Sequence, residues 1–310
     1  MSDSSQPRLT AKPAEFPLPG GEAGASVTLH PLLCAEMDGP VGWFHRAKGP
    51  TAALKALGIG VPAEQNVSVP IVAFLVEHPT AGLILVDTGF HGSIAAGSGA
   101  ERNRNLGPVG RVLARSVRMS PEQTVAAQLR ARGIDPADLA VIVMTHLHFD
   151  HASGLADFPG ATVLVAEPEW QSARGRGGAL RGYSVAQLDP ALNYRTFDFN
   201  APGAVPRGAF AQTVDVFGDG SVTLASTPGH SSGHLSVILR LSSREALIAG
   251  DAIYTIATLR DGERPWRSED AKAFERSLSA IQAYDREHPE ALIIPGHDME
   301  HWRGLDTQYS

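Results

Sequence analysis

The stretch Thr145-His-Leu-His-Phe-Asp-His151 follows the apolar run Leu139-Ala-Val-Ile-Val-Met144. Such a run predicts a short buried strand, so the polar stretch stands at a strand end. His146 and His148 are two residues apart, and in an extended turn their side chains can point the same way. Imidazole nitrogens and carboxylate oxygens are ligands of divalent metal ions. The stretch therefore predicts one side of a metal site.

The other candidate ligands complete a larger set. Asp150 and His151 come where the chain bends and can face a second ion. Three more candidates stand far downstream, in the segments Thr227-Pro-Gly-His230, Ala249-Gly-Asp251 and Pro295-Gly-His297. Asp251 is the natural bridge, because a carboxylate can give one oxygen to each of two ions about 3.5–4 Å apart. Zinc is the metal expected, and the ligand types also suit iron, manganese or cobalt.

Composition limits the classes of function. The chain has 310 residues, of which 43% are hydrophobic, so it can bury a substantial core. Its formal net charge of −7 argues against a nucleic-acid binder, which needs a basic face. Five arginines between positions 102 and 118 form either a solvated face or a phosphate-binding stripe. No stretch approaches the ~20 apolar residues that span a bilayer, and no membrane partner is expected.

Cysteine usage and the N-terminus suggest a compartment. Cys34 is the only cysteine, so no intramolecular disulfide and no thiolate cluster can form. Residues 1–26 are rich in Ser and Pro, lack the pattern of a signal peptide, and are expected to form a flexible extension. Residues 27–310 are expected to form one hydrolase domain. A cytoplasmic protein is the simplest interpretation.

Hydrophobic patterning predicts two α/β halves. Apolar strands that end in an aspartate occur in both, at Leu83–Asp87 and Ala246–Asp251. Two such halves predict two sheets packed face to face, with helices outside. The pattern favours loops at 92–110 and 175–210. It favours helices at 121–132, 167–174 and 268–287, and strands at 27–33, 67–77, 82–86, 161–166, 213–217, 222–226, 234–241, 245–249 and 292–294.

The ligand pattern resembles that of the metallo-β-lactamase superfamily, whose signature is His-x-His-x-Asp-His with a distant His, Asp and His. The resemblance covers nearly all of the chain after residue 27 and implies a four-layer αββα sandwich with the site at one edge. It implies that Asp251 bridges two metals, of which one takes His146, His148 and His230. The other would take Asp150, His151 and His297. Asp87, in Asp87-Thr-Gly89, either orients a ligand histidine or forms a turn.

Several members of the superfamily fit less well. Zinc β-lactamases generally lack the bridging aspartate, and one large class uses a cysteine in the second site. A glyoxalase-type thioesterase would add a helical domain, but only 13 residues follow His297. Overall acidity disfavours a nuclease of the ribonuclease Z type. An arylesterase or organophosphate hydrolase stays a close alternative. A structural zinc protein is disfavoured, because such sites are usually closed by four ligands.

The chain most resembles N-acyl homoserine lactone lactonases, the quorum-quenching branch. The segments that carry the resemblance are 146–154, 227–234, Asp251-Ala-Ile-Tyr254 and 296–298. It implies that a metal-bridging hydroxide attacks the lactone carbonyl, while Tyr254 hydrogen-bonds to the oxyanion and Asp150 hands a proton to the leaving alkoxide. The expected partner is a small lactone or ester, and the expected assembly a monomer or homodimer.

Some residues are assigned lesser roles. The N-terminal extension and the segments 92–118 and 174–182 lie where such lactonases shape the acyl pocket. Trp43, Phe44 and Tyr183 are either pocket aromatics or simple packing residues. Four histidines without a ligand-like context are expected to be structural or at the surface: His45, His91, His234 and His301.

Overall fold

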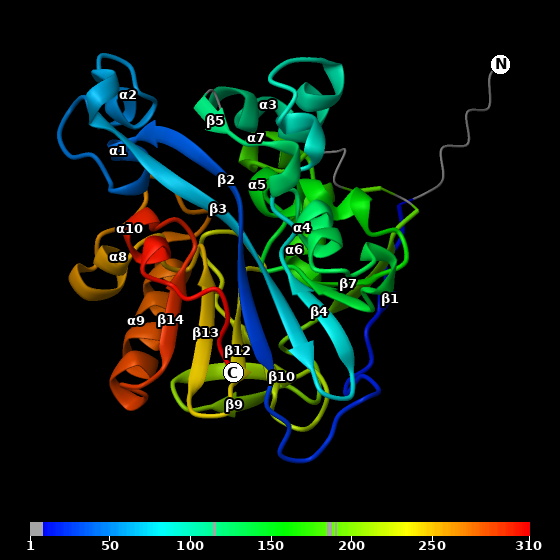
Figure 1. Cartoon of the computed structure of the whole chain (residues 1–310). Coiled ribbons are helices and arrows are strands. Elements are labelled where there is room, and N and C mark those ends of the chain that lie inside the picture. Colours follow the sequence, from blue (N-terminus) through cyan, green and yellow to red (C-terminus); the bar gives the residue numbers. More distant parts are fainter. Residues whose placement is uncertain (1–8, 114–115, 185–187, 190) are drawn as a thin grey trace.

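The computed structural model describes residues 9–113, 116–184, 188–189 and 191–310. Two β-sheets lie face to face, and helices cover the outer face of each (Figure 1). The expected four-layer αββα sandwich is thereby confirmed. Among the described residues the first sheet has eight strands, in the order β1 (Lys12–Pro13), β8 (Asn193–Phe197), β7 (Thr162–Ala166), β6 (Val141–Val143), β4 (Gly82–Val86), β3 (Asn66–His78), β2 (Thr28–Pro40) and β5 (Ser116–Arg118).

The second sheet has six strands among the described residues. Their order is β14 (Leu292–Pro295), β13 (Glu245–Gly250), β12 (Leu235–Arg240), β11 (Val222–Ser226), β10 (Phe210–Asp215) and β9 (Val205–Arg207). β12 is antiparallel to both β11 and β13, and β14 is parallel to β13, so β11, β13 and β14 run the same way. Their carboxyl ends therefore share one edge of the sandwich.

The parallel strands of the first sheet reach that edge too. β4 pairs in parallel with β6, and β6 with β7. Asp87 follows β4 directly, and the segment 145–151 follows β6 after one more residue. Carboxyl ends of parallel strands are where polar residues of α/β sheets gather. The fold thus brings the polar segments of both halves together.

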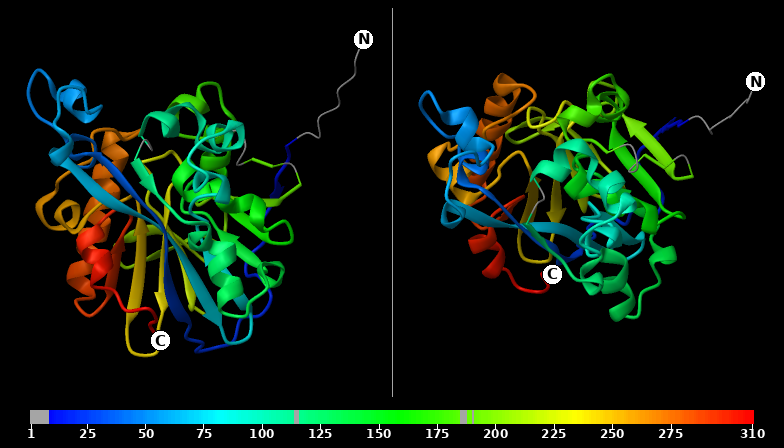
Figure 2. Two further views of the ribbon diagram at one scale, coloured as in Figure 1. Left: turned by 45° about the horizontal axis from the view of Figure 1, so that its top comes forward. Right: turned by 90° about the horizontal axis from the view of Figure 1, so that it is seen from above.

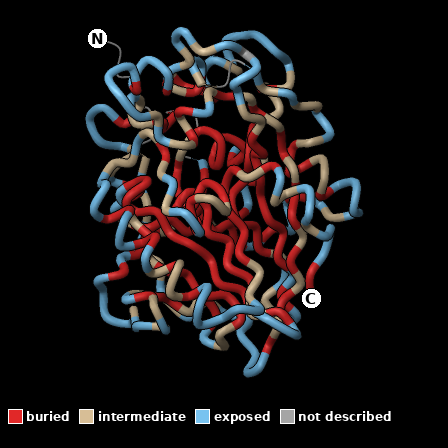
Figure 3. The backbone as a smooth tube through the Cα atoms, turned by 90° about the vertical axis from the view of Figure 1, so that its left-hand side faces the viewer, coloured by how far each residue is buried: buried red, intermediate tan, exposed pale blue. Residues whose placement is uncertain are grey.

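Alternation along the strands builds the layers. Val72, Phe74 and Val76 of β3 join the core between the sheets, and the intervening residues 71, 73 and 75 join the core under the outer helices. Both sets are fully or almost fully buried, as the red interior of the tube in Figure 3 illustrates. The first sheet is consequently apolar on both faces, which accounts for its continuous hydrophobic runs.

Amphipathic helices close the two outer faces (Figure 2). α9 (Ala271–Glu287) buries Phe274, Leu278, Ile281 and Tyr284 in a cluster with Ile238, Leu247 and Ile293 of the second sheet. Asp270 caps it by accepting from the amides of Lys272 and Ala273 at 2.8 and 3.0 Å. The other α-helices are α1 (Val41–Phe44), α2 (Ala52–Ala56), α3 (Ala100–Leu113), α4 (Val125–Ala131), α5 (Phe149–Ala152), α6 (Glu167–Arg174), α7 (Gly178–Arg181), α8 (Ile256–Asp261) and α10 (Met299–Arg303).

Short 3-10 turns connect several of these elements. They are η1 (Ala63–Gln65), η2 (Gly92–Ile94), η3 (Pro121–Gln123), η4 (Pro136–Asp138) and η5 (Ser153–Asp157). None of the helices in the described part of the chain is long and apolar enough to cross a membrane.

Residues 9–26 differ from the loose extension expected for 1–26. β1 adds a parallel strand beside β8, and the ring of Phe16 packs edge-on against Phe197 at 5.4 Å. The Leu18 amide donates to the Val216 carbonyl at 2.7 Å. Phe16 and Leu18 pack against the core between the sheets, and this apolar burial holds the segment down. Residues 1–8 of the predicted extension lie outside the described residues.

Three other segments depart from expectation. The connection at 92–110 contains most of α3, which is interrupted at Gly107 with φ 63°. The helix expected at 121–132 is divided, because Thr124 is extended and caps α4 by accepting from the Ala127 amide at 3.2 Å. The loop expected at 175–210 contains α7, β8 and β9. Positions 185–187 and 190 of this last segment lie outside the described residues, as do positions 114–115, which follow α3.

Candidate metal centre

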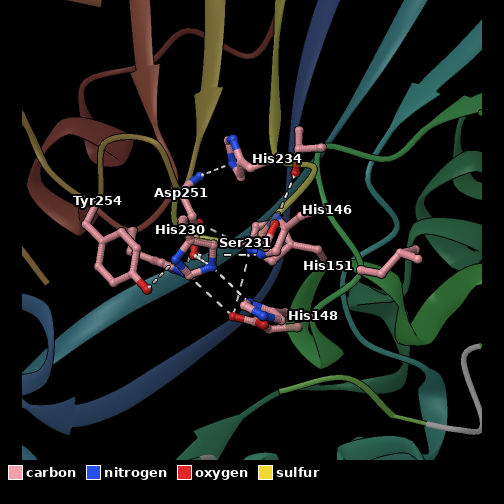
Figure 4. Close-up of polar contacts among 12 residues, drawn as sticks. His146, His148, His151, His230, Ser231, His234, Asp251 and Tyr254 are labelled. Carbon is pink, nitrogen blue, oxygen red and sulfur yellow. Dashed lines mark hydrogen bonds and ion pairs between the residues drawn. The ribbon is translucent and has the colours of Figure 1, made fainter. Parts of the chain in front are cut away.

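All the ligands predicted from the sequence lie in one cluster at the edge where the strands end. Figure 4 labels five of them: His146, His148, His151, His230 and Asp251. The first sheet contributes the residues that follow β6 and begin α5. The second sheet contributes one residue after each of β11, β13 and β14. All are buried except His148, which is half-buried: the set is His146, His148, Asp150, His151, His230, Asp251 and His297.

The cluster divides into groups that could hold an ion. Ligand atoms within each group lie within 4.8 Å of one another, and two of the groups are His146, His148, His230 and Asp150, His151, His297. These are the two ligand sets expected from the sequence. Nδ1 of His148 and Nε2 of His230 face each other at 2.8 Å. The role of each residue as a ligand stays a prediction, but the geometry groups them as predicted.

Asp251 lies between the two groups. Its Oδ2 is 3.2 Å from Nε2 of His230 and 3.9 Å from Nε2 of His146. Its Oδ1 is 3.3 Å from Nε2 of both His151 and His297. Each carboxylate oxygen therefore faces a different group, which is the arrangement that a bridging ligand needs.

The outer nitrogens of three histidines are held by polar neighbours. Nδ1 of His151 lies 2.8 Å from Oδ2 of Asp87, so the predicted contact between Asp87 and a ligand histidine is present. Nδ1 of His297 donates to the Pro70 carbonyl at 3.2 Å, and Nδ1 of His146 lies 3.1 Å from Oγ1 of Thr145. Such contacts fix ring orientation and leave Nε2 directed at the centre.

The site carries buried atoms that have no hydrogen-bond partner in the described part of the chain. They include Nε2 of His146, together with Nε2 of His151 and Oδ1 of Asp251, which lie 3.3 Å apart without forming a hydrogen bond. An unpaired buried polar atom costs about 1–3 kcal/mol, so three in one cluster need a common explanation. Burial also holds the pKa of His146 and His230 well below the usual value, which favours the neutral imidazole that a metal requires. The residues thus fit divalent metal ions.

Tyr254 lies beside this cluster. Its hydroxyl is 3.3 Å from Nδ1 of His230, and the side chain is buried. Burial, reinforced by the charges of Asp251 and Asp150, raises its pKa well above the usual value. The phenol therefore keeps its proton at neutral pH and is a hydrogen-bond donor.

A cavity opens onto the cluster. Its polar lining includes His148, Asp150, His230, Asp251, Tyr254 and His297, together with Arg181, Arg267, Ser268 and Glu269. Its apolar wall is formed by Met37, Trp43, Phe44, Val109, Leu113 and Leu180. Trp43 and Phe44 are thus pocket aromatics. Tyr183 is instead buried against His148, with ring centroids 5.0 Å apart.

Sequence reasoning missed the part that His234 plays. The ring is buried, and its Nε2 accepts from the Asp251 amide at 3.0 Å, while Nδ1 lies 3.0 Å from Oγ1 of Thr227 (Figure 4). Burial lowers the pKa of His234 to about 3, so the ring is a neutral acceptor. A histidine directly before the apolar strand β12 was the available signal. His45, His91 and His301 lie outside the candidate metal groups.

Sequence reasoning also did not single out Glu169. Its carboxylate is buried beneath the cluster and accepts three hydrogen bonds. Burial raises its pKa, against the opposing effect of His148 and of the donors. Nothing local distinguishes Glu169 from the partly exposed Glu167, because its partners come from distant turns.

The chain belongs to the metallo-beta-lactamase superfamily, whose family model matches residues 68–297. It is 30% identical over 238 residues to N-acyl homoserine lactonase AttM of Agrobacterium fabrum, covering 76% of this chain and 84% of the relative. It is 31% identical over 276 residues to a probable metallo-hydrolase of Mycobacterium tuberculosis, covering 82% and 83%. Family and relatives make it a metal-dependent hydrolase.

Solved structures share the fold. A quorum-quenching N-acyl homoserine lactone lactonase superposes with a TM-score of 0.70 at 23% identity, covering 92% of this chain and 98% of that one. An N-acyl homoserine lactone hydrolase with N-hexanoyl-L-homoserine bound at its catalytic metal center gives 0.69 at 24% identity, covering 91% and 97%.

Proposed function

We propose that this protein is a dinuclear-metal lactonase that opens the ring of N-acyl homoserine lactones, and so a quorum-quenching enzyme. One observation carries the proposal: candidate metal ligands, the Tyr254 hydroxyl and an apolar wall share a single cavity. A lactone carbonyl would lie between the metal centre and the Tyr254 hydroxyl, and an acyl chain would lie against the apolar wall. The lactonase names of the relatives support the same reaction.

The metal ligands proposed are the two sets of three, with Asp251 as the bridge. Zinc is the metal proposed, with iron, manganese or cobalt as the alternatives that the same nitrogen and oxygen donors suit. When bound, two such ions would supply a water activated at neutral pH and polarise the carbonyl. Asp87 and the Pro70 carbonyl would keep His151 and His297 in the tautomer that ligation requires.

Tyr254 would donate a hydrogen bond to the carbonyl oxygen of the lactone. With Nε2 of His230 turned towards the metal site, Nδ1 carries the ring proton and donates to the phenol oxygen 3.3 Å away. The hydroxyl proton of Tyr254 is then free to point into the cavity. There it would donate to the carbonyl oxygen as that oxygen gains negative charge, a contribution of about 2.7–4 kcal/mol when preorganised.

Asp150 would transfer a proton from the attacking water to the leaving ring oxygen. Ring opening adds the elements of water across the acyl–oxygen bond, so the ring oxygen leaves and must gain a hydrogen. Asp150 lines the cavity, with Oδ2 3.6 Å from Nε2 of His297 and 3.9 Å from Nε2 of His151. Its carboxylate can hold the proton released by the attacking water and pass it to the ring oxygen.

The deciding experiment is a pH-stat assay of the metal-loaded protein. Homoserine lactones with acyl chains of several lengths would be compared with an aryl ester and a phosphotriester. We expect acid release to be fastest with the lactones. Slow lactone opening beside rapid ester or phosphotriester cleavage would replace this proposal by the arylesterase or organophosphate hydrolase alternative.

The compartment and the partner also belong to the proposal. We propose a cytoplasmic enzyme, supported by Cys34, which is buried as a free thiol. The proposed partner is the small lactone alone. A monomer or homodimer is proposed, to be checked by sedimentation.

A further inference from the structure

We propose that Glu169 is a positioning residue that ties together the two turns carrying His146, His148 and His230. The inference rests on the proposed metal centre but not on the identity of the substrate. Glu169 lies in the first turn of α6, and its carboxylate reaches both turns. Its side chain is 1% exposed and touches neither the cavity nor a candidate ligand by hydrogen bond.

Each carboxylate oxygen of Glu169 holds a different turn. Oε1 accepts from the Leu147 amide at 2.9 Å. Oε2 accepts from the Ser231 hydroxyl at 2.6 Å and from the Gly233 amide at 3.0 Å. All three partners are donors, so the group acts as an acceptor-only carboxylate, and bonds to an ionised acceptor are the stronger kind.

The residues that Glu169 holds are chain neighbours of the ligands. Leu147 stands between His146 and His148, and Ser231 follows His230 directly. The first turn comes from one sheet and the second from the other. Fixing both amides to one carboxylate therefore fixes the distance between the turns, and His148 and His230 face each other across it at 2.8 Å.

Steric contact supports the same arrangement. A Cβ added at Gly233 would lie 2.2 Å from the backbone nitrogen of Glu169 and 2.6 Å from its Cβ. The turn after His230 thus rests directly on the start of α6, with room for glycine alone. The hydrogen bond from the Gly233 amide needs this close approach.

The second ligand set is supported by other groups. His151 is held by Asp87, and His297 by the Pro70 carbonyl. The hydrogen bonds of Glu169 reach neither of them. Loss of the Glu169 carboxylate is therefore expected to weaken one metal site and spare the other.

The test is a titration of metal-free full-length protein with Co²⁺, followed by its visible absorption and by competition with a chelator. Glu169→Gln is nearly isosteric but puts an amide donor against one of the three donors. Glu167→Gln is the matched control, because Glu167 starts the same helix and bonds only to the exposed Gln171 among the described residues. Ser231→Ala removes a single donor and leaves Glu169 in place.

We expect Glu169→Gln to weaken one of two Co²⁺ sites by about 10–100-fold and to change its absorption, with the other site unaltered. Ser231→Ala should shift the same site by less, and it replaces Glu169→Gln if that variant does not fold. Two unchanged sites in both variants would overturn the inference, as would equal weakening of both sites with a lower unfolding temperature. A wild-type protein that binds fewer than two ions would instead overturn the proposed centre itself.

Discussion

Oδ2 of Asp87 lies 2.8 Å from Nδ1 of His151, and Asp87 holds this position with a backbone φ of 59°. It is the only non-glycine residue with positive φ in the part of the chain that the structure describes. The same carboxylate accepts from the amide and the hydroxyl of Thr145 at 2.8 and 2.7 Å. A strained backbone of this kind costs on the order of 1 kcal/mol and persists where the surroundings fix it.

Asp87→Asn tests the link between that carboxylate and the metal site. Asn tolerates positive φ, so the backbone can stay as it is. Its amide would donate to Nδ1 of His151 and force the ring proton onto Nε2, the atom that faces Asp251. We expect metal content to fall towards one ion per chain and kcat to drop by about 10–100-fold.

Metal analysis by mass spectrometry, together with lactone turnover, measures this effect. Asp135→Asn is the control, because the exposed Asp135 caps η4 and neither lines the cavity nor belongs to a candidate metal group. Full metal content with unaltered kcat in Asp87→Asn would refute the orienting role.

Tyr254→Phe removes the hydroxyl proposed to meet the carbonyl oxygen. The ring still packs between Phe44 and His297, at 6.1 and 5.2 Å between centroids, so the cavity keeps its shape. We expect kcat to fall by on the order of 10²-fold, with two ions still bound. Steady-state kinetics on metal-loaded protein measures this. Unchanged kcat would remove Tyr254 from the mechanism.

The apolar wall of the cavity predicts a preference for acyl chains of a certain length. Val109 lines the cavity, whereas Val112, on the same helix, is 47% exposed and does not line it. Val109→Trp should fill part of the wall and lower kcat/KM for long acyl chains by about tenfold relative to short ones. Val112→Trp should leave the ratio alone. Equal ratios in the two variants would mean that the acyl chain lies elsewhere.

Cys34 predicts an inert thiol. Burial, with a smaller effect of Asp87, raises its pKa, and a protonated buried thiol is a poor nucleophile. The thiol ionises readily only in the unfolded chain, so alkaline pH should lower the stability of the folded state. The thiol of the native chain should stay protonated and unlabelled. A disulfide reagent at pH 8 should label one thiol per chain in denaturant and none in native protein. Rapid native labelling would contradict the burial.

Much of the fold could be predicted because its signals are local. The strand at 82–86 and the helix at 167–174 occur with the bounds that periodicity indicated. The candidate ligands could be found because each follows an apolar strand at a Gly- or His-rich turn. An apolar strand and the polar motif that follows it lie within a few residues of each other, so the sequence alone shows both.

What could not be predicted depends on long-range contacts. Glu169 bonds to residues 22, 62 and 64 positions away, and His234 matters only because β13 brings the Asp251 amide to it. In the sequence, Phe16 and Leu18 stand in a polar, Pro-rich segment, and only the folded structure shows that they pack against the core between the sheets. Burial of such groups is a property of the assembled sandwich and leaves no local pattern.

Each candidate group of three ligands draws on both sheets: His146 and His148 with His230, and Asp150 and His151 with His297. Before the sheets dock, neither half of the chain holds a complete set. If each group holds an ion, capture of that ion would be a late event in the assembly of this protein, and it would lock together two halves that were already folded against each other. Bound metals would cross-link the two sheets, so removal of metal should weaken the packing between the sheets before it unfolds either sheet.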